Sequence, residues 1–591
     1  MKKLYALFVS LAIALVIAGS VYAQSTTDTV YIPGSKSLQI STIINADTSV
    51  KASRVYVLDR GAIYYIDKAF EINRPCKFIA TGDATKRPPV LAAAIRADGS
   101  AEEWYFKLIE KGISVELNDL YLLSMRSDGK SLGWSRAIHI GADNVSLKLR
   151  RVVMDGWTEA GIRVDGADFV KLDVQDCHFR NFIHSTSYFG GQPFLTNNND
   201  HPDTTIFINN TFFACNAYIF SIRGAGPKAV FSHNTIAYTV VNPFETGQGD
   251  NMYINNNLFY AVHGWGGNPE QIIGSWLENA PDTVSSSVFQ FKKKFYGFYG
   301  NARYACDGPE AYYKDLNKTF DPSTRTVQAH KNVLFNPDKI TSFYTKWNDT
   351  VKSYDSVADY TGGAKVYVKR TLTMAPWLNN LGKQTVDSLG NPKSWDYSSH
   401  VSVDDALNSD PSFSDAATVG HIDSLVNYVK RIATSSLDNG WQYKMVFPPA
   451  WPVPEKLVYT NSSLLNAGTD GFAIGDLNWF PTQKASWLTG VKTLSTSVPK
   501  EYTLSQNYPN PFNPETKIDF TVTKPGVVKI SIYNILGQKI RTLINQEFKA
   551  GAYNVTWDGR NDFGKVASSG TYLYSLETKD VRLTKKMIFM K

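Results

Sequence analysis

One short pattern recurs in the chain, as Phe207-Ile-Asn-Asn-Thr-Phe212, Phe231-Ser-His-Asn-Thr-Ile236 and Tyr253-Ile-Asn-Asn-Asn-Leu258. In each copy a β-prone start runs into a polar turn, and a second short apolar stretch follows. Three earlier segments align with these copies without gaps, namely Glu116–Tyr121, Lys148–Val153 and Asp173–His178. The second residue of each of the six segments recurs at moderately even intervals along the chain. These residues are Leu117, Leu149, Val174, Ile208, Ser232 and Ile254. The pattern indicates a repeat of one strand, one turn and another strand.

A single unit of this size cannot cover its own apolar face, whereas stacked units share a continuous core. The repeat therefore predicts an all-β right-handed parallel β-helix, with Asn209, Asn234 and Asn256 stacked as a polar ladder inside the turns. Helical repeats would place apolar residues three and four positions apart, and these units are too rich in Asn, β-branched and aromatic residues for that. A sandwich of hairpins is the alternative, although its strands are expected to be more evenly spaced.

The β-helix is expected to span residues 24–400 and to carry long loop insertions, because the repeat weakens after Phe259. Residues 401–490 are expected to form its C-terminal part or a cap, with a helix near residues 423–432. Residues 491–506 are expected to be a linker.

The composition limits the class of protein only broadly. The 591 residues are 43% hydrophobic and 13% aromatic, which is enough for a large core. A formal net charge of +7 is mild for this length and gives no case for nucleic acid as a partner. The cysteines are few, and the sequence does not show which of them pair: Cys76, Cys177, Cys215 and Cys306.

The N-terminus has the pattern of a secretory signal peptide over residues 1–23. Lys2 and Lys3 precede an apolar run from Leu4 to Ile17, and the small residues of Val21-Tyr-Ala23 predict cleavage before Gln24. The run is short for an uncleaved membrane anchor. No later stretch is long and apolar enough to cross a bilayer, so we expect a secreted or surface-held protein without a stable membrane span.

The C-terminal region, residues 507–591, reads as a small antiparallel β-sandwich with strands near residues 517–522, 527–533, 552–557 and 571–577. It contains Asn507-Tyr-Pro-Asn-Pro-Phe-Asn-Pro514, Tyr533-Asn-Ile-Leu-Gly-Gln-Lys539 and Trp557-Asp-Gly-Arg-Asn-Asp562. On these motifs the segment resembles the type A C-terminal sorting domain of the bacterial type IX secretion system, which has an immunoglobulin-like fold. The resemblance implies that the type IX machinery is a partner and that the protein passes the outer membrane.

The β-helix itself resembles the pectate-lyase superfamily, and within it the alginate lyase and chondroitinase B family. The resemblance is carried by Asn210-Thr-Phe-Phe213, Cys215-Asn-Ala-Tyr-Ile219, Ile222-Arg-Gly224, His233-Asn-Thr-Ile236, Phe244-Glu-Thr-Gly247 and Asn255-Asn-Asn-Leu-Phe259. It implies a polysaccharide or surface glycan as the partner and a site on the concave face of the helix.

The positions that carry chemistry in that family are changed in this chain. Two glutamates that hold calcium in the family correspond to Asn216 and Tyr218, the lysine base to Arg223, and the assisting arginine to Glu245. An arginine stays protonated and is a poor general base. The loss of two anionic ligands also disfavours calcium, so no metal ligand is assigned. The resemblance therefore does not extend to the family's mechanism.

Arg223 and Glu245 are nevertheless candidate catalytic residues in a new arrangement, together with His201 from the loop Asn197–Asp203 and with Lys228. Tyr188 and Trp265 are candidates for stacking on sugar faces, and Asn216 and Tyr218 for contacts with substrate. A plain turn explains His201 better than a site does, and a solvated loop lysine explains Lys228 better. For Tyr188 and Trp265, packing in the core or cap explains the residues as well as sugar stacking does.

A further candidate is an acid pair for glycoside hydrolysis from the charged residues around one coil: Asp155, Glu159, Arg163 and Asp165. Such a pair needs a defined separation between its carboxyl groups, which a sequence does not give. Two classes of function stay open. One is an exported lyase or glycoside hydrolase with a non-standard site, and the other is a non-catalytic envelope protein that binds glycan or has a structural or adhesive role.

Overall fold

The computed structural model describes residues 28–47, 54–184, 190–196, 200–222, 226–240, 243–246, 251–262, 289–291, 313–319, 326–350, 401–432, 441–489, 491–495, 499–562 and 566–590. The chain divides into two compact units. One consists of residues 1–469 with 474–479, and the other of residues 470–473 with 480–591.

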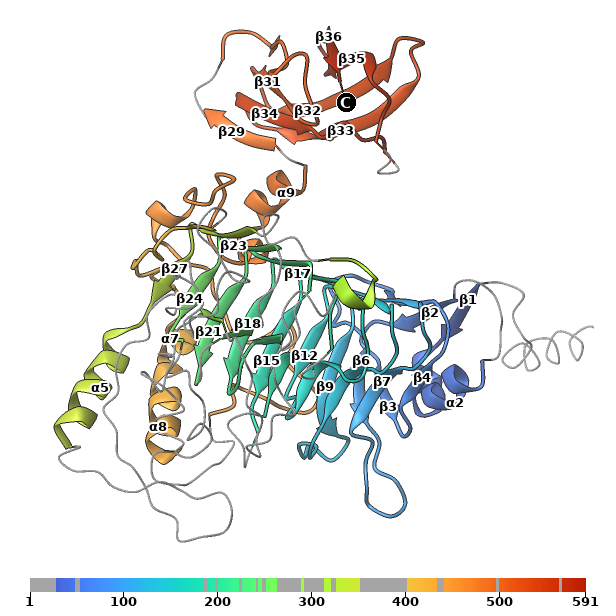
Figure 1. Cartoon of the computed structure of the whole chain (residues 1–591), viewed down its shortest axis with the longest axis vertical. Coiled ribbons are helices and arrows are strands. Elements are labelled where there is room, and N and C mark those ends of the chain that lie inside the picture. The colour runs from blue at the N-terminus through green and yellow to red at the C-terminus, as the bar shows by residue number, and fades with distance from the viewer. Residues whose placement is uncertain are drawn as a thin grey trace, which may run out of the picture. The chain divides into compact units, whose positions relative to one another are not determined.

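The first unit is a solenoid of three parallel sheets, which we call A, B and C, and each coil adds one strand to each sheet (Figure 1). Sheet A consists of β1 (Thr29–Ile32), β2 (Arg54–Asp59), β5 (Cys76–Thr81), β8 (Ser114–Asn118), β11 (Ser146–Arg150), β14 (Lys171–Gln175), β17 (Thr204–Ile208), β20 (Lys228–Ser232), β23 (Asn251–Asn255), β26 (Thr326–His330) and β28 (Val401–Val403).

Sheet B consists of β3 (Ile63–Ile66), β6 (Val90–Ala93), β9 (Tyr121–Arg126), β12 (Val153–Asp155), β15 (His178–Phe182), β18 (Thr211–Cys215), β21 (Thr235–Thr239), β24 (Leu258–Tyr260) and β27 (Val333–Phe335). Sheet C consists of β4 (Phe70–Ile72), β7 (Trp104–Leu108), β10 (Arg136–Ile140), β13 (Ala160–Val164), β16 (Gln192–Thr196), β19 (Phe220–Ile222), β22 (Phe244–Thr246) and β25 (Phe289–Phe291). These parallel sheets confirm the predicted β-helix.

The core of the solenoid is filled by inward side chains that stack in register. In sheet A the stacked column is Phe78, Leu117, Leu149, Val174, Phe207, Phe231 and Ile254. The gapless alignment of the sequence was therefore wrong by one residue in two segments, because it placed Ile208 and Ser232 in this column. Side chains alternate between the two faces of a strand, so the large apolar Phe207 and Phe231 take the inward positions.

The predicted asparagine ladder exists, but two of its members differ from the prediction. Asn210 donates to Asn234 at 2.9 Å, Asn234 donates to Asn257 at 3.0 Å, and Asn257 donates to Asn332 at 3.0 Å, each from Nδ2 to Oδ1. All four side chains are buried. The ladder follows the turn residue by one position, and in earlier coils this position holds the apolar residues Leu120, Val152 and Cys177.

Asn209 and Asn256, the other two predicted members, adopt the left-handed backbone conformation of the turn, with φ of 55° and 61°. Asn is one of the few residues with a side chain that tolerate this conformation. Their side chains contact Thr469 and Leu477 instead of the ladder. The amide of Thr469 donates to Asn256 Oδ1 at 2.8 Å, and the amide of Leu477 donates to Asn209 Oδ1 at 3.3 Å.

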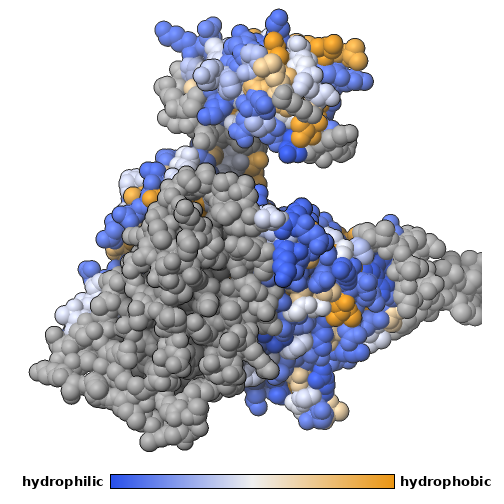
Figure 2. All heavy atoms as spheres, viewed as in Figure 1, coloured by the Kyte–Doolittle hydropathy of each residue, from blue (hydrophilic) through white to orange (hydrophobic). Residues whose placement is uncertain are grey.

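Helices lie at both ends of the described solenoid sequence. The 3-10 helix η1 (Gly34–Gln39) and α2 (Ile40–Asn45) follow β1, and Ile40 and Ile44 of α2 join the core. Further along lie α5 (Asp338–Thr350), α7 (Ala416–Gly420) and α8 (Ile422–Ile432), and α8 confirms the helix predicted near residues 423–432. None of the described helices is long and apolar enough to span a membrane. The described surface in Figure 2 is mainly hydrophilic.

The second unit contains α9 (Pro481–Thr489) and an antiparallel sandwich. One sheet has the order β29 (Val491–Ser495), β34 (Gly551–Trp557), β31 (Thr516–Val522) and β30 (Thr503–Leu504), and the other has β33 (Lys539–Phe548), β32 (Gly526–Asn534), β35 (Gly570–Glu577) and β36 (Arg582–Phe589). The predicted sandwich is confirmed. The segment 491–506, expected to be a linker, contributes β29 and β30, which pair with β34 and β31.

The cysteines that the structure describes are buried. Cys76, Cys177 and Cys215 each carry a free thiol, and burial raises the pKa of Cys76 and of Cys177 to about 12. Cys306 lies outside the described residues, as does the predicted signal peptide.

A buried ionic network, which we call the clasp, ties the segment 441–459 to sheet B. Arg180 of β15 donates to Glu455 at 2.8 Å, to Asp155 at 2.5 Å and to the carbonyl oxygen of Tyr443 at 2.5 Å. His178 Nε2 lies 2.6 Å from Glu455 Oε1. Charges buried this deeply are tolerated only when they are paired, so each partner depends on the others.

The clasp predicts a loss of stability in acid. Burial favours the neutral form of Glu455, but Arg180 and His178 outweigh this effect and lower its pKa from 4.5 to about 2. Because the pKa is lower in the folded state, the stability that the Glu455 charge contributes is complete above the unfolded pKa and is lost as the pH falls from 4.5 toward 2. At pH 7, Glu455→Gln should cost about 3–5 kcal/mol. In thermal unfolding of the full chain, the difference from wild type should shrink across this pH window.

The control is Asp423→Asn, which removes an ion pair with Lys339 whose side chains are 58% and 62% exposed. An exposed pair contributes little, so this variant should unfold close to wild type at pH 7. Equal effects of the two substitutions would contradict the role of the clasp.

Candidate functional site

Sheet C carries a row of polar side chains that point away from the core. Lys107 of β7, His139 of β10 and Arg163 of β13 are register partners on neighbouring strands. The core-facing residues beside them, among them Phe106 and Ile138, are fully or almost fully buried. Strands in a sheet lie about 4.8 Å apart, so the row presents one side chain per coil at that spacing.

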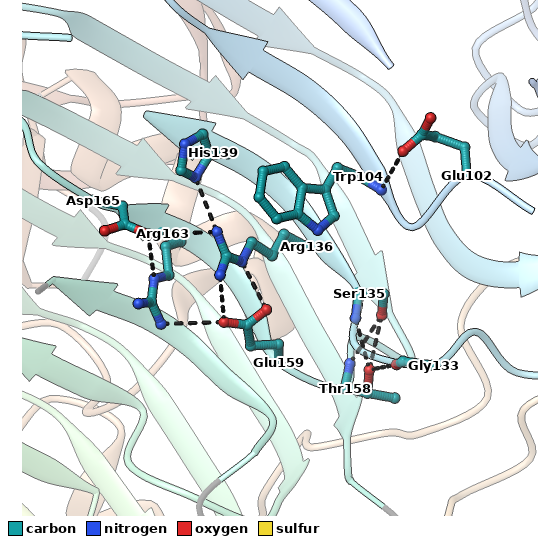
Figure 3. Close-up of polar contacts among 10 residues, drawn as sticks. All are labelled: Glu102, Trp104, Gly133, Ser135, Arg136, His139, Thr158, Glu159, Arg163 and Asp165. Carbon is teal, nitrogen blue, oxygen red and sulfur yellow. Dashed lines mark hydrogen bonds and ion pairs between the residues drawn. The ribbon is translucent and has the colours of Figure 1, made fainter. Parts of the chain in front are cut away.

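Trp104, at the start of β7, packs against two members of this row, Lys107 and His139, and against Arg136 of β10. The guanidinium carbon of Arg136 lies 4.2 Å from the centroid of the indole ring, and Lys107 Nζ lies 5.0 Å from it. The His139 ring lies 4.9 Å from the indole ring at an interplanar angle of 31°. Figure 3 shows the indole beside Arg136 and His139, whose Nη1 and Nδ1 atoms lie 3.2 Å apart. A cation over an indole face is attracted by the ring, so these contacts hold the ring in place.

Glu159 joins the two arginines of this face. Arg136 binds it through two hydrogen bonds, at 2.7 Å from Nε and 2.8 Å from Nη2, and Arg163 Nη1 lies 3.2 Å from the same carboxylate. Asp165 lies within 3.6 Å of Arg136 and 3.5 Å of Arg163. The two-point contact fixes the plane of the Glu159 carboxylate (Figure 3). Two cations and two anions thus alternate in one network.

A cavity of about 580 Å³ opens beside Trp104. It is lined by Arg96, Ser100, Ala101, Glu102, Glu103, Trp104, Lys107, Arg126, Ser131, Leu132 and Gly133. Two loops supply most of its wall, and each is closed by an antiparallel bridge, Ile95 with Ala101 and Met125 with Ser131. The cavity therefore lies between sheet C and the loops that precede its strands.

Two adjacent carboxyl groups in the cavity have different surroundings. Glu102 accepts from Arg96 at 2.7 Å and from the amide of Trp104 at 3.2 Å. Glu103 pairs with no cation within the described part of the chain. Burial raises the pKa of Glu103 above its ordinary value, and the neighbouring charges of Glu102 and Glu159 raise it further, although a hydrogen bond from the Gly133 backbone opposes this.

Three of the predicted site residues are buried: Asn216 and Tyr218, which the resemblance suggested, and His201, which the loop Asn197–Asp203 suggested. Asn216 is fully buried, donates to the hydroxyl of Tyr428 at 2.9 Å and accepts from Trp441 at 3.2 Å. Tyr218 is 3% exposed and His201 is 3% exposed. The structure places these three side chains away from solvent, so packing accounts for them.

The proposed catalytic residues do not come together on one sheet. Lys228 begins β20 of sheet A, whereas Glu245 lies on β22 of sheet C, in the same register row as Arg163. Arg223, Tyr188 and Trp265 lie outside the described residues.

Of the four charged residues that the sequence grouped around one coil, the structure brings three together: Glu159, Arg163 and Asp165. Asp155 belongs to the clasp on sheet B. A further group was not predicted from the sequence and consists of Glu103, Trp104, Lys107, Arg136 and His139. A signal was present, because Lys107, His139 and Arg163 recur along the chain at nearly the same intervals as the sheet A repeat in the same coils.

Comparisons with known proteins gave one family match and several distant structural likenesses. Residues 510–581 match the family of FlgD Ig-like domains. Among solved structures, latent PorU from Porphyromonas gingivalis is 18% identical, with 16% of this chain and 10% of that chain covered and a TM-score of 0.14. PorZ, described as an essential surface component of the type IX secretion system of Porphyromonas gingivalis, is 16% identical, with coverage of 17% and 12% and a TM-score of 0.12.

An alginate lyase from Paenibacillus sp. str. FPU-7 is 10% identical, with 44% of this chain and 90% of that chain covered and a TM-score of 0.25. The chain spans only about a tenth of the length of PorU and PorZ. No curated protein matches the sequence. The fold and the domain match together define a parallel β-solenoid protein with a C-terminal domain similar to FlgD Ig-like domains.

The site predicts an acidic titration for His139. Burial lowers its pKa from 6.5 to about 4, and the Arg136 charge contributes to the same shift. His139 should therefore be neutral above about pH 5. In Arg136→Met the midpoint should rise toward 6.5, because a nearby cation is removed while Asp165 still favours the protonated ring. Ring resonances followed by NMR measure both midpoints.

Arg151→Met is the matched control, because Arg151 pairs with Asp119 at a turn after sheet A and not with this site. It should leave the His139 midpoint where it is in wild type. A wild-type midpoint near 6.5 would contradict the packing described for the ring.

Proposed function

We propose that the protein is exported and binds polysaccharide along the outer face of sheet C. The observation that carries this proposal is the row of register partners Lys107, His139 and Arg163, with Trp104 and Arg136 beside it. The spacing of the row, about 4.8 Å per strand, is close to the length of one sugar unit in an extended chain. A polysaccharide that lies along the solenoid axis would meet one coil per sugar.

The chemistry of the row suits sugars. An indole ring presents a flat apolar face on which a sugar ring can stack, and charged groups at its edge donate to and accept from hydroxyl groups. Glu159 and Asp165 compensate Arg136 and Arg163, so the row is polar without a large net charge. The cavity beside Trp104 provides room for a branch or a chain end.

Export is proposed on the C-terminal unit. Its sandwich and the motifs within residues 507–591 resemble type IX sorting domains, and residues 510–581 match an Ig-like family. A glycan-binding solenoid on such a domain would act outside the cell or at its surface.

Binding is tested by affinity gel electrophoresis of the full chain in gels that contain uronic or neutral polysaccharides. At least one polysaccharide should retard wild type, and Trp104→Ala should weaken that binding roughly tenfold, since loss of a stacking face costs about 1–2 kcal/mol. Trp451→Ala is the matched control, because Trp451 is 40% exposed and lies in the segment along sheet B. Equal weakening by both substitutions, or no retardation of wild type in any gel, would refute the proposal.

Export is tested in a bacterium that has a type IX system. The full chain should reach the medium or the cell surface, whereas a chain ending at Trp479, which lacks the sandwich, should stay in the periplasm. Cell fractions probed with an antibody against the solenoid give the result. Equal distribution of the two chains would show that residues 480–591 do not direct export.

A further inference from the structure

We propose that the cavity beside Trp104 binds a tetrahedral oxyanion, a sulfate or phosphate ester, that a sugar of the polysaccharide carries. This inference rests on the binding function proposed above and adds the chemical class of the substituent that the cavity accepts. Three observations support it: the excess of cations in the cavity wall, two side-chain donors there without a partner, and arginines whose paired donors are already in use.

The residues that line the cavity carry more cations than carboxyl groups. The cations are those of Arg96, Lys107 and Arg126, and the carboxyl groups are those of Glu102 and Glu103. Arg96 and Glu102 form an ion pair at 2.7 Å, so their charges compensate each other. Two cations then remain in the wall against one carboxyl group, and this excess attracts an anionic ligand.

Lys107 is the cation best placed to bind such a ligand. Among the described residues its ammonium group has no ion pair and no hydrogen bond, although it has three N–H donors. Its Nζ lies 5.0 Å from the centroid of the Trp104 ring. A sugar that stacks on Trp104 therefore brings its substituents within reach of this ammonium group.

Arg126, the last residue of β9, adds a donor from a second strand. Its Nη2 donates to Asp128 at 3.1 Å, whereas its Nε is buried and has no hydrogen-bond partner in the part of the chain that the structure describes. A buried donor without a partner costs free energy. An oxygen of a bound anion would accept from this Nε and remove the cost.

The wall favours a tetrahedral oxyanion over a carboxylate. A carboxylate is held best by two parallel hydrogen bonds from one guanidinium group. All three nitrogens of Arg96 already donate within the structure, and so does Nη2 of Arg126. A sulfate or phosphate ester has three terminal oxygens that point in different directions, so it can accept single bonds from Lys107 and Arg126 at once.

Glu103 is the group in the wall that opposes an anion. It pairs with no cation among the described residues, and burial raises its pKa, as do the charges of Glu102 and Glu159. Its negative charge would repel a bound ester. A substitution that removes this charge should therefore strengthen binding, which a substitution that only damages the fold would not do.

The test uses the full chain and four ligands that share one sugar frame: glucose 6-sulfate, glucose 6-phosphate, glucuronate and glucose. Their dissociation constants are measured by ligand-observed NMR titration, with inorganic sulfate as an anion that carries no sugar. At least one of the two esters should bind about tenfold or more tightly than glucuronate, which has a carboxylate at the same carbon, and than glucose. The tighter of the two esters identifies the substituent.

Variants of the wall assign the effect to its residues. Lys107→Met should weaken ester binding about tenfold and leave glucose binding unchanged, since it removes a charge-assisted hydrogen bond but keeps an apolar stem. Lys107→Arg should restore part of the loss. The matched control is Lys171→Met, because Lys171 lies on sheet A and pairs with Asp203 at 3.3 Å. Glu103→Gln should strengthen ester binding about threefold or more.

The outcomes distinguish this inference from the function on which it rests. If a polysaccharide gel retards wild type but the esters bind no better than glucose, the oxyanion site is refuted and polysaccharide binding stands. Absence of both refutes both. Tightest binding of glucuronate would assign the cavity to a carboxylate, and equal affinity for inorganic sulfate would assign it to a free anion, so either result would overturn the inference. Equal effects of Lys107→Met and Lys171→Met would overturn the role of Lys107.

Discussion

Parallel pairing in register is the constraint on which the rest of the molecule depends. Each coil adds one strand to each of three sheets, so every side chain gains neighbours that are one coil away rather than adjacent in sequence. The aromatic core illustrates this constraint. Phe220 packs against Phe231 at a ring-centroid distance of 4.4 Å and against Phe244 at 4.8 Å, although the three residues lie on different strands. The same pairing brings the carboxylate of Glu159 to the two arginines of sheet C.

The fold was predictable from the sequence because its signal is periodic and strongly apolar. The recurring units and the turn asparagines were sufficient for the β-helix, and alternating strands between Gly and Asn turns were sufficient for the sandwich. The register was harder to predict. Ile208 and Phe207 are both apolar and adjacent, so a gapless alignment chose the wrong one, and only the burial of the phenylalanine settles which of them faces the core.

The candidate site was less predictable for a related reason. Its members come from separate coils, and Arg136 and Glu159 become neighbours only once the exact lengths of the intervening loops are known. The residues suggested by resemblance, Asn216 and Tyr218, mark the position of a coil but are buried, and Asn216 is covered by the C-terminal segment of the solenoid unit. That segment is held by ion pairs such as Arg180 with Glu455, which lie far apart in the sequence, and no local pattern announces such a contact.

The stacking of coils has a consequence for how such a site can change during evolution. The backbones of two register partners on one sheet are a whole number of strand spacings apart, so this distance changes in steps rather than by gradual drift. Moving a side chain by one coil would change its backbone distance from a fixed partner by about 4.8 Å, without any change of scaffold. In a solenoid of this kind, substitutions alone can therefore move a functional group from one coil to another while the fold is kept.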